Sequence, residues 1–329
     1  MGTTPKDVLI AGVNKAGTTS LFVSLSEHPG IVPAAIKETR FFLPPRYEQP
    51  IAPVDVYQGY FEEATEGQVR LEATPSYFYG GAVVASVIND TLPGARIVVV
   101  LREPVARAIS FFQYQKTRLR IPPELSIEDY LAHADALIDL DFLDPENERF
   151  FAVGGGRYAD FLPGWLEVFG TDRLRIVSFE KLTQDPARVL RETTEWLGLD
   201  PGLLPIDALS SENKTMGFKS RRFQRFALAA NDRFERILRR NPGAKRRIRA
   251  VYFRLNGQSA DKRVSDEVRA ELAERFREPN RRLARQLASG GFSLPSWLEA
   301  GVDEGVDEGV VDEGVDDGAV ADGRSVGIP

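Results

Sequence analysis

The sequence predicts an α/β fold in which a central parallel sheet is flanked by helices in three layers. Short apolar runs alternate with amphipathic segments between residues 7 and 197. The run at 95–101, Ala-Arg-Ile-Val-Val-Val-Leu, is almost wholly apolar, as in strands that helices cover on both faces. This alternation with short links is typical of parallel sheets with crossover helices.

Residues 7–20 form the first strand–loop–helix unit and contain a predicted phosphate site. The apolar run at 8–10 suits a buried strand and is too short for a buried helix. Gly12 and Gly17 bracket a tight turn, and a helical pattern begins directly after Gly17. At such a junction, backbone N–H groups and the positive end of the helix dipole converge on an anion.

The loop is P-loop-like but differs from a triphosphate loop in the place of its lysine. Gly12 and Gly17 match the glycines of G-x-x-x-x-G-K-[ST], yet Thr18 follows the second glycine and Lys15 lies inside the loop. In triphosphate loops the lysine contacts the β- and γ-phosphates and a hydroxyl binds magnesium. The displaced lysine favours a donor with a shorter anionic tail and no essential metal. An ordinary strand-to-helix turn with an exposed lysine is the alternative.

The next segment, 31–67, is rich in proline and predicts a long surface excursion. Within it, Phe41 and Phe42 are expected to anchor the loop in the core. Glu38, just before them, is a candidate functional residue. A second strand is predicted at 68–74, followed by a short helix at 81–90.

The strand at 95–101 leads into a second candidate anion site. Arg102 leaves this strand at its carboxyl end, the edge where open α/β sheets bind ligands. Pro104 is placed to begin a helix that carries Ser110. A guanidinium fork and a hydroxyl can together hold a phosphate in a fixed orientation. The alternative is a strand-end salt bridge between Arg102 and Glu103.

The rest of the chain continues the alternation and then becomes helical. Its arginine pairs, such as Arg239-Arg240, usually mark a solvated helix face, with a polyanion contact as the less common alternative. The predicted elements are a helix after Ser126, a mobile loop at 139–157, a helix at 158–169, a strand at 174–179, a helix at 186–197 and an arginine-rich helical region at 217–287.

Composition excludes several classes of chemistry. The chain has no cysteine, so disulfides, thiolate metal sites and a cysteine nucleophile are excluded. It has only two histidines, His28 and His133, so a serine–histidine triad or a multi-histidine metal centre would depend on them. Both are expected to be surface or helix-end residues.

Charge is unevenly distributed along the 329 residues. The net charge is −6, but residues 301–329 hold nine acidic residues and one arginine, so the preceding part is close to neutral. A near-neutral body with local basic clusters suits small anionic ligands and not nucleic acid. The tail repeats Gly-Val-Asp-Glu without aromatic residues, so we expect a folded domain at 1–298 and a disordered acidic tail at 299–329.

No part of the sequence reads as a targeting or membrane segment. The first predicted strand begins within seven residues of the N-terminus, without a separate apolar core region, and no apolar run reaches 18 residues. We therefore expect a soluble, cytoplasmic protein without a membrane span.

Together these segments resemble the sulfotransferase family that uses 3′-phosphoadenosine-5′-phosphosulfate (PAPS). The resemblance is closest to the branch of heparan sulfate glucosaminyl sulfotransferases and their bacterial relatives. It extends from about residue 7 to residue 287. The segments that carry it are 15–20, 37–42, 72–78, Arg102 to Ser110, and Glu278-Pro279-Asn280.

The resemblance implies roles for particular residues. Glu38 would be the general base that takes a proton from the acceptor hydroxyl or amine. Arg102 and Ser110 would bind the 3′-phosphate, and Arg263, next to Lys262, would lie near the nucleotide. The catalytic lysine, Lys15, would bind the 5′-phosphosulfate. The backbone N–H groups that follow it would bind the same group; they belong to Ala16, Gly17, Thr18, Thr19 and Ser20.

One departure and two alternatives stay open. Ala73 stands where carbohydrate sulfotransferases have a lysine near the acceptor, which puts a sulfated glycosaminoglycan acceptor in doubt but not the chemistry. A P-loop kinase or NTPase is the first alternative, and the missing lysine after Gly17 argues against it. The second is a non-catalytic nucleotide-binding module. We expect PAPS and an acceptor, possibly a carbohydrate or glycolipid, as the binding partners.

Overall fold

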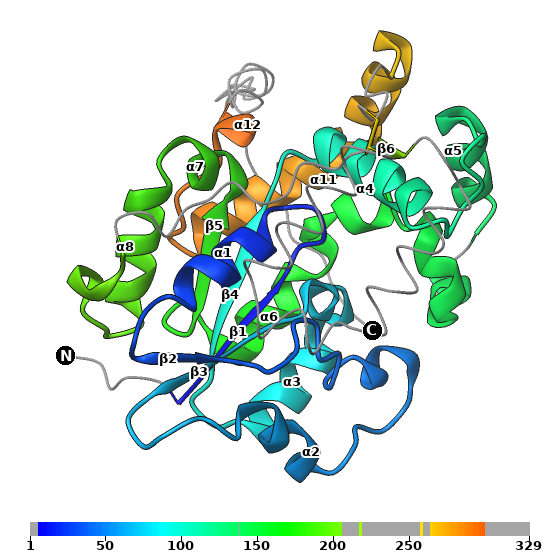
Figure 1. Ribbon diagram of the computed structural model, residues 1–329. Coiled ribbons are helices and arrows are strands. Elements are labelled where there is room, and N and C mark those ends of the chain that lie inside the picture. The colour runs from blue at the N-terminus through cyan, green and yellow to red at the C-terminus, as the bar shows by residue number, and fades with distance from the viewer. Residues whose placement is uncertain (1–5, 138, 206–216, 219–256, 259–263, 300–329) are drawn as a thin grey trace, which may run out of the picture.

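The centre of the molecule is a five-stranded parallel sheet (Figure 1). The computed structural model describes residues 6–137, 139–205, 217–218, 257–258 and 264–299. Within them the strand order is β2-β3-β1-β4-β5. The strands are β1 (Asp7–Gly12), β2 (Ile31–Pro33), β3 (Val69–Ala73), β4 (Arg96–Leu101) and β5 (Leu174–Ser178).

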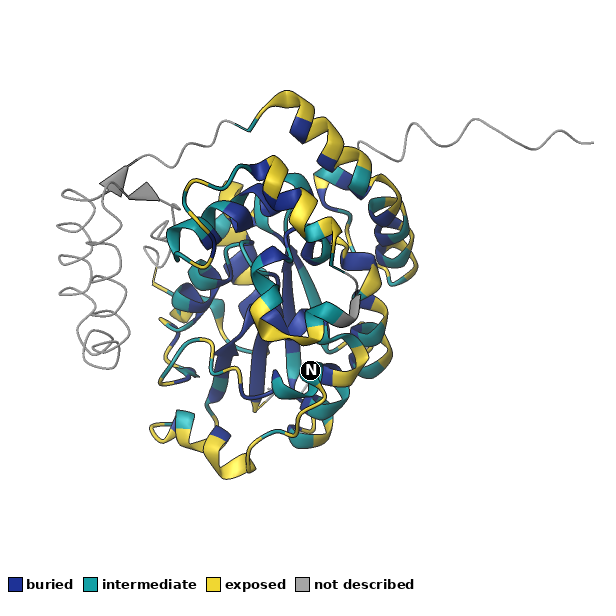
Figure 2. Ribbon diagram, turned by 90° about the vertical axis from the view of Figure 1, so that its right-hand side faces the viewer, coloured by how far each residue is buried: buried dark blue, intermediate teal, exposed yellow. Residues whose placement is uncertain are grey.

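Helices cover both faces of this sheet, which confirms the predicted fold class. The main ones are α1 (Thr18–Leu25), α2 (Val54–Gln58), α3 (Gly81–Thr91), α4 (Pro104–Thr117), α5 (Ile127–Asp135), α6 (Leu162–Phe169), α7 (Phe179–Gln184), α8 (Pro186–Trp196), α11 (Asp266–Ser289) and α12 (Ser296–Glu299). All six residues of β1 are buried, and Figure 2 shows the strands as a dark layer between helices with exposed outer faces.

The strand order creates a switch in direction beside β1. The chain goes from β1 to the edge strand β2 and then to β3 on one side, crosses past β1 to β4 and continues to β5. Because parallel crossovers are right-handed, the two directions put helices on opposite faces. Accordingly, α1 packs beside α8, and α3 packs beside α6. Ligands of open α/β sheets bind at such a switch, here beyond the carboxyl ends of β1 and β4.

Most predicted elements are confirmed, but two segments differ from expectation. The 31–67 excursion contributes the edge strand β2, whereas Phe41 and Phe42 are buried in the core, as expected. The predicted mobile loop at 139–157 forms 3-10 turns in its described part, one of them Gly154–Gly156. A Cβ on Gly156 would lie 2.6 Å from the Phe276 ring, so this glycine permits close packing against α11.

Several predictions fall outside the described residues. These are Lys262, Arg263, the arginine-rich segment at 219–256 and the acidic tail from residue 300. At the edges of that segment, β6 (Gly217–Phe218) pairs antiparallel with β7 (Gly257–Gln258), where only helix was expected. In the part of the chain that the structure describes, no helix has the length and apolar character needed to cross a membrane.

Candidate active site

The loop between β1 and α1 turns back sharply through left-handed backbone. Lys15 has φ 72° and Gly17 has φ 79°, and Gly17 is the N-cap of α1. A Cβ on Gly17 would also lie 2.9 Å from the Phe179 ring, so both conformation and space require glycine here. Because the cap residue supplies no side-chain oxygen, the first N–H groups of α1 stay open to a ligand.

Lys15 occupies a poorly hydrated position at the centre of this loop. Its Nζ lies 4.3 Å from the centroid of the Tyr114 ring on α4. Burial, followed by repulsion from Arg102, lowers the pKa of Lys15 to about 8. The negative charge of Glu38 opposes this shift of the Lys15 pKa.

Arg102 joins the loop directly from the neighbouring strand. Its Nη1 donates a hydrogen bond of 2.8 Å to the carbonyl oxygen of Lys15, and its guanidinium lies 4.5 Å from the Phe179 ring centroid. Burial lowers the pKa of Arg102 below its ordinary value. Glu103 does not hold this arginine: its carboxylate caps α4 by accepting from the N–H groups of Val105 and Ala106. The structure therefore brings together the two segments that the sequence marked as anion sites.

Ser110 lies on the face of α4 that is turned toward the loop. It is six residues into the helix, and Tyr114, which contacts Lys15, follows it by one turn. Ser110 is partly exposed. Tyr114 was not expected from the sequence, because an aromatic residue at helical spacing usually indicates only core packing.

Glu38 lies in a turn that passes the carboxyl end of β3. Its backbone has φ 60°, and its N–H donates to the carbonyl oxygen of Ala73 at 3.0 Å. Its side chain is 51% exposed and accepts a 2.8 Å hydrogen bond from Lys37 Nζ. Ala73 itself is fully buried.

The charge around Glu38 favours its ionised form. Partial desolvation alone would raise the pKa of this half-exposed carboxyl, but Lys37 and two arginines hold the pKa below its ordinary value. The arginines are Arg40 and Arg118, the latter at the end of α4. Glu38 is thus an exposed, ionised carboxylate beside the carboxyl end of β3, a position that suits a base for a substrate arriving from solvent.

The two histidines have structural surroundings. The ring of His28 is buried, with Nε2 2.9 Å from the carbonyl oxygen of Asp200 and Nδ1 accepting from Gly30 N–H. His133 lies against the Phe150 ring at 4.1 Å between centroids. Among the described residues, no cluster of three histidine or acidic side chains is arranged to hold a metal ion.

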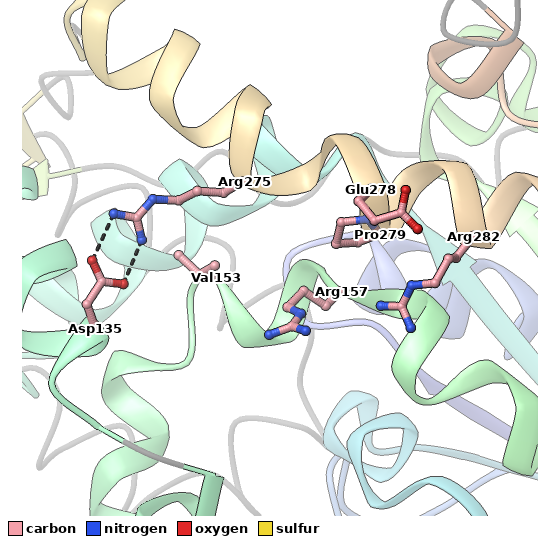
Figure 3. Close-up of a pocket in the computed structure, with 7 residues that line it drawn as sticks. All are labelled: Asp135, Val153, Arg157, Arg275, Glu278, Pro279 and Arg282. Carbon is pink, nitrogen blue, oxygen red and sulfur yellow. Dashed lines mark hydrogen bonds and ion pairs between the residues drawn. The ribbon is translucent and has the colours of Figure 1, made fainter. Parts of the chain in front are cut away.

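A cavity of about 600 Å³ lies elsewhere, between α11, α5 and the 154–157 segment (Figure 3). Its arginines are paired with carboxylates: Arg275 binds Asp135 at 2.6 and 2.8 Å, and Arg157 and Arg282 both reach Asp160. It is lined by Asp135, Val153, Arg157, Arg275, Glu278, Pro279 and Arg282. None of these residues belongs to the loop between β1 and α1. Because the charges of the arginines are compensated by carboxylates, this cavity does not suit a phosphorylated donor.

The fold and the loop define an α/β domain whose glycine loop lies at the switch beside β1, where open α/β sheets bind ligands. Residues 5–245 match the family model for the sulfotransferase domain, and the chain belongs to this family. A solved sulfotransferase from Alicyclobacillus acidocaldarius has a similar fold, with a TM-score of 0.55 and 24% identity over 72% of this chain and 95% of that chain.

Two curated relatives are named as heparan sulfate enzymes. The bifunctional heparan sulfate N-deacetylase/N-sulfotransferase 1 of Caenorhabditis briggsae is 26% identical over 310 residues, 90% of this chain and 32% of the relative. The mouse heparan sulfate glucosamine 3-O-sulfotransferase 6 is 33% identical over 191 residues, 58% of this chain and 52% of the relative. The chain thus spans about a third to a half of the length of these relatives.

Proposed function

We propose that this chain transfers a sulfuryl group from PAPS to a hydroxyl or amine of a carbohydrate or glycolipid acceptor. The observation that carries the proposal is the 2.8 Å hydrogen bond from Arg102 to the Lys15 carbonyl. It places a guanidinium from β4 against the glycine loop from β1, so one ligand with two separated anionic groups can span both. Family membership supports sulfur chemistry over phosphoryl transfer.

The donor set fits an anionic co-substrate. Lys15 is a partly desolvated cation, and the uncapped start of α1 presents N–H groups beside it. Arg102 and Ser110 would hold the 3′-phosphate, as planar and hydroxyl donors suited to phosphate oxygens. When bound, PAPS supplies an electrophilic sulfur that is joined to a phosphate leaving group.

During sulfuryl transfer, negative charge develops on the leaving phosphate oxygen and the acceptor loses a proton, and these two changes define the roles of the protein groups. The acceptor oxygen or nitrogen forms a bond to sulfur while the bond between sulfur and the phosphate oxygen breaks, and its electron pair stays on that oxygen. Lys15 and the loop N–H groups stabilise this developing charge. Glu38 takes the proton of the acceptor, and the products are the sulfated acceptor and 3′-phosphoadenosine-5′-phosphate (PAP).

The acceptor side of the site is less charged than the resemblance suggests. Ala73 is fully buried and contributes only its carbonyl oxygen, which accepts from Glu38 N–H. Lys37, paired with Glu38, is the cation nearest to that carboxylate. A carbohydrate hydroxyl or amine meets the need for a weakly acidic proton that Glu38 can remove.

Calorimetric titration with PAP, with ATP as the competing nucleotide, tests the donor assignment. We expect PAP to bind at least about tenfold more tightly than ATP, with no requirement for magnesium. Equal binding of ATP, or phosphoryl transfer from it, would overturn the proposal in favour of a P-loop kinase.

The base assignment needs its own variant. We expect Glu38→Gln to lower the rate of sulfuryl transfer by about 10²–10⁴-fold, the usual contribution of a positioned base, while PAP affinity is retained. Glu48→Gln is the matched control, because Glu48 lies in the same excursion with a left-handed backbone but outside the site. Transfer by Glu38→Gln at the unmodified rate would show that another group removes the proton.

A further inference from the structure

The turn that carries Glu38 is bound to the strand behind it by a network of side-chain hydroxyls. Three successive backbone N–H groups donate to them: Arg40 to Thr74 Oγ1 at 3.3 Å, Phe41 to Thr39 Oγ1 at 3.3 Å, and Phe42 to Tyr77 Oη at 3.1 Å. After the backbone bond from Glu38 N–H to the Ala73 carbonyl oxygen, the turn is therefore held by side-chain hydroxyls.

All three hydroxyls point to one carboxylate oxygen. Oε1 of Glu72 accepts from Thr39 at 2.8 Å, from Thr74 at 2.6 Å and from Tyr77 at 3.1 Å. Glu72 is at the end of β3 and is completely buried. Its second oxygen, Oε2, is also buried and has no hydrogen-bond donor among the described residues.

The chemistry of a carboxylate fixes the direction of this network. A hydroxyl can donate one hydrogen bond and accept others, whereas a carboxylate oxygen only accepts. Each hydroxyl therefore donates its hydrogen bond to Glu72. The lone pairs of the hydroxyl oxygen are then available to accept from the N–H groups of the turn. Burial raises the pKa of Glu72, while the three hydroxyls oppose that shift.

The held backbone is one that would not persist unaided. Glu38 has φ 60° and Arg40 has φ 58°, two left-handed residues within three positions. Non-glycine residues in this region are strained and persist only where surrounding contacts impose them. The hydroxyl network supplies such contacts on the side of the turn away from solvent.

From this geometry we propose that Glu72 is a positioning residue for Glu38. By orienting three hydroxyls toward the turn, it sets the place of the base relative to the donor loop without touching the donor or the acceptor. The inference rests on the proposed function for the role of Glu38, but the hold of Glu72 on the turn is a separate structural claim.

Two pairs of variants test this claim. Glu72→Met removes the accepting oxygen with little change in length, and Glu72→Gln restores one accepting oxygen. Thr39→Val removes one hydroxyl at constant shape, and Thr39→Ser restores it. The Thr39 pair keeps the test decisive if Glu72→Met fails to fold, because Thr39 is only partly buried.

The first readout is amide hydrogen exchange, which needs no activity. We expect the 38–43 segment to exchange about tenfold faster in Glu72→Met and Thr39→Val, while α4 keeps its protection. Glu72→Gln and Thr39→Ser should stay within about threefold of the unmodified protein. Unchanged exchange in folded Thr39→Val would overturn the proposal.

The second readout separates positioning of the base from binding of the donor. We expect kcat to fall on the order of 10²-fold in Glu72→Met and Thr39→Val at unchanged PAP affinity, with recovery in the two conservative variants. An equal loss of PAP affinity would overturn the proposal, because the network would then act on the whole site. If the unmodified protein transfers no sulfuryl group, the proposed function fails, and the exchange result alone decides whether Glu72 holds the turn.

Discussion

At the scale of single residues, Lys15 has the largest expected influence on the reaction. Its ammonium group is partly desolvated, lies near the aromatic ring of Tyr114 and is repelled by Arg102. A cation in such a place has little water to screen it, so it interacts strongly with an oxygen that becomes negative. The same surroundings make its proton easier to lose.

We expect Lys15→Ala to lower kcat by about 10²–10³-fold, as for the loss of one oxyanion-hole donor, with little change in thermal unfolding. Steady-state kinetics of sulfuryl transfer and a melting curve measure the two quantities. Lys181→Ala is the control, because Lys181 is an exposed lysine on α7. A similar loss in both variants would indicate a general effect of charge.

The pKa of Lys15 also predicts the pH dependence of donor binding. With a pKa of about 8, the side chain is mostly charged below pH 8 and loses its charge above it. PAP affinity should therefore be nearly constant up to about pH 7 and fall between about pH 8 and 10, with a flatter profile in Lys15→Ala.

Linkage gives a second measurement of the same effect. A bound anion favours the charged lysine, so binding near pH 8.5 should take up a fraction of a proton. Calorimetry in two buffers of different ionisation enthalpy detects that uptake. A binding enthalpy that is independent of the buffer would contradict the role of Lys15.

At the scale of elements, α4 is held in place by close backbone approach as well as by its cap. The 154–156 turn packs against it, and a Cβ on Gly155 would lie 3.0 Å from Nη1 of the buried Arg107. On the other side of the turn, Gly156 faces Phe276 of α11 and Pro104 of α4. The position of Ser110 and Tyr114 therefore depends on glycines that lie more than 40 residues further along the chain.

We expect Gly156→Ala to destabilise the fold by about 1–3 kcal/mol, because its methyl group would overlap the Phe276 ring. Gly59→Ala is the control: nothing lies within 4 Å of its Cβ position and its φ is −60°, so stability should be unchanged or rise by up to about 1 kcal/mol. Denaturant unfolding measures both. Equal stability of the two variants would show that α11 can move away at no cost.

The elements that the sequence predicted well are those with a strong local signal. The apolar run of β4 and the Pro104 start of α4 appear where expected, since periodicity and proline geometry act over a few residues. The edge strand β2 was missed, because three residues give no period. The close packing of Gly155 and Gly156 has no sequence signal of its own, because glycine marks flexible and tightly packed backbone in the same way.

At the scale of the whole molecule, the site depends on contacts between distant segments. Local sequence patterns predict the glycine loop and Arg102 as anion sites. They lie in contact because the strands that precede them, β1 and β4, are neighbours in the sheet. The hydroxyl network around Glu72 was not predicted, because three common polar residues and one carboxylate carry no spacing rule. Only the fold shows that Thr39 lies against Tyr77, 38 positions away.

The acidic segment at 301–329 gives a prediction for the full chain. Its composition offers no apolar surface large enough to contribute to a core, so its removal should leave the melting temperature and kcat unchanged within about twofold. Matched chains with and without these residues, assayed for PAP binding and sulfuryl transfer, check this expectation. A loss of transfer at retained PAP affinity would assign the segment to the acceptor side.

The place of β1 in the sheet has a consequence for biosynthesis. This wholly buried strand lies at residues 7–12, yet both of its edges are covered by strands that are made later, the second of them ending at residue 101. A ribosome must therefore produce roughly ninety further residues before the strand can be fully paired. Until then its apolar surface is open to chaperones or to aggregation, so the yield of folded protein should depend on how this interval is protected.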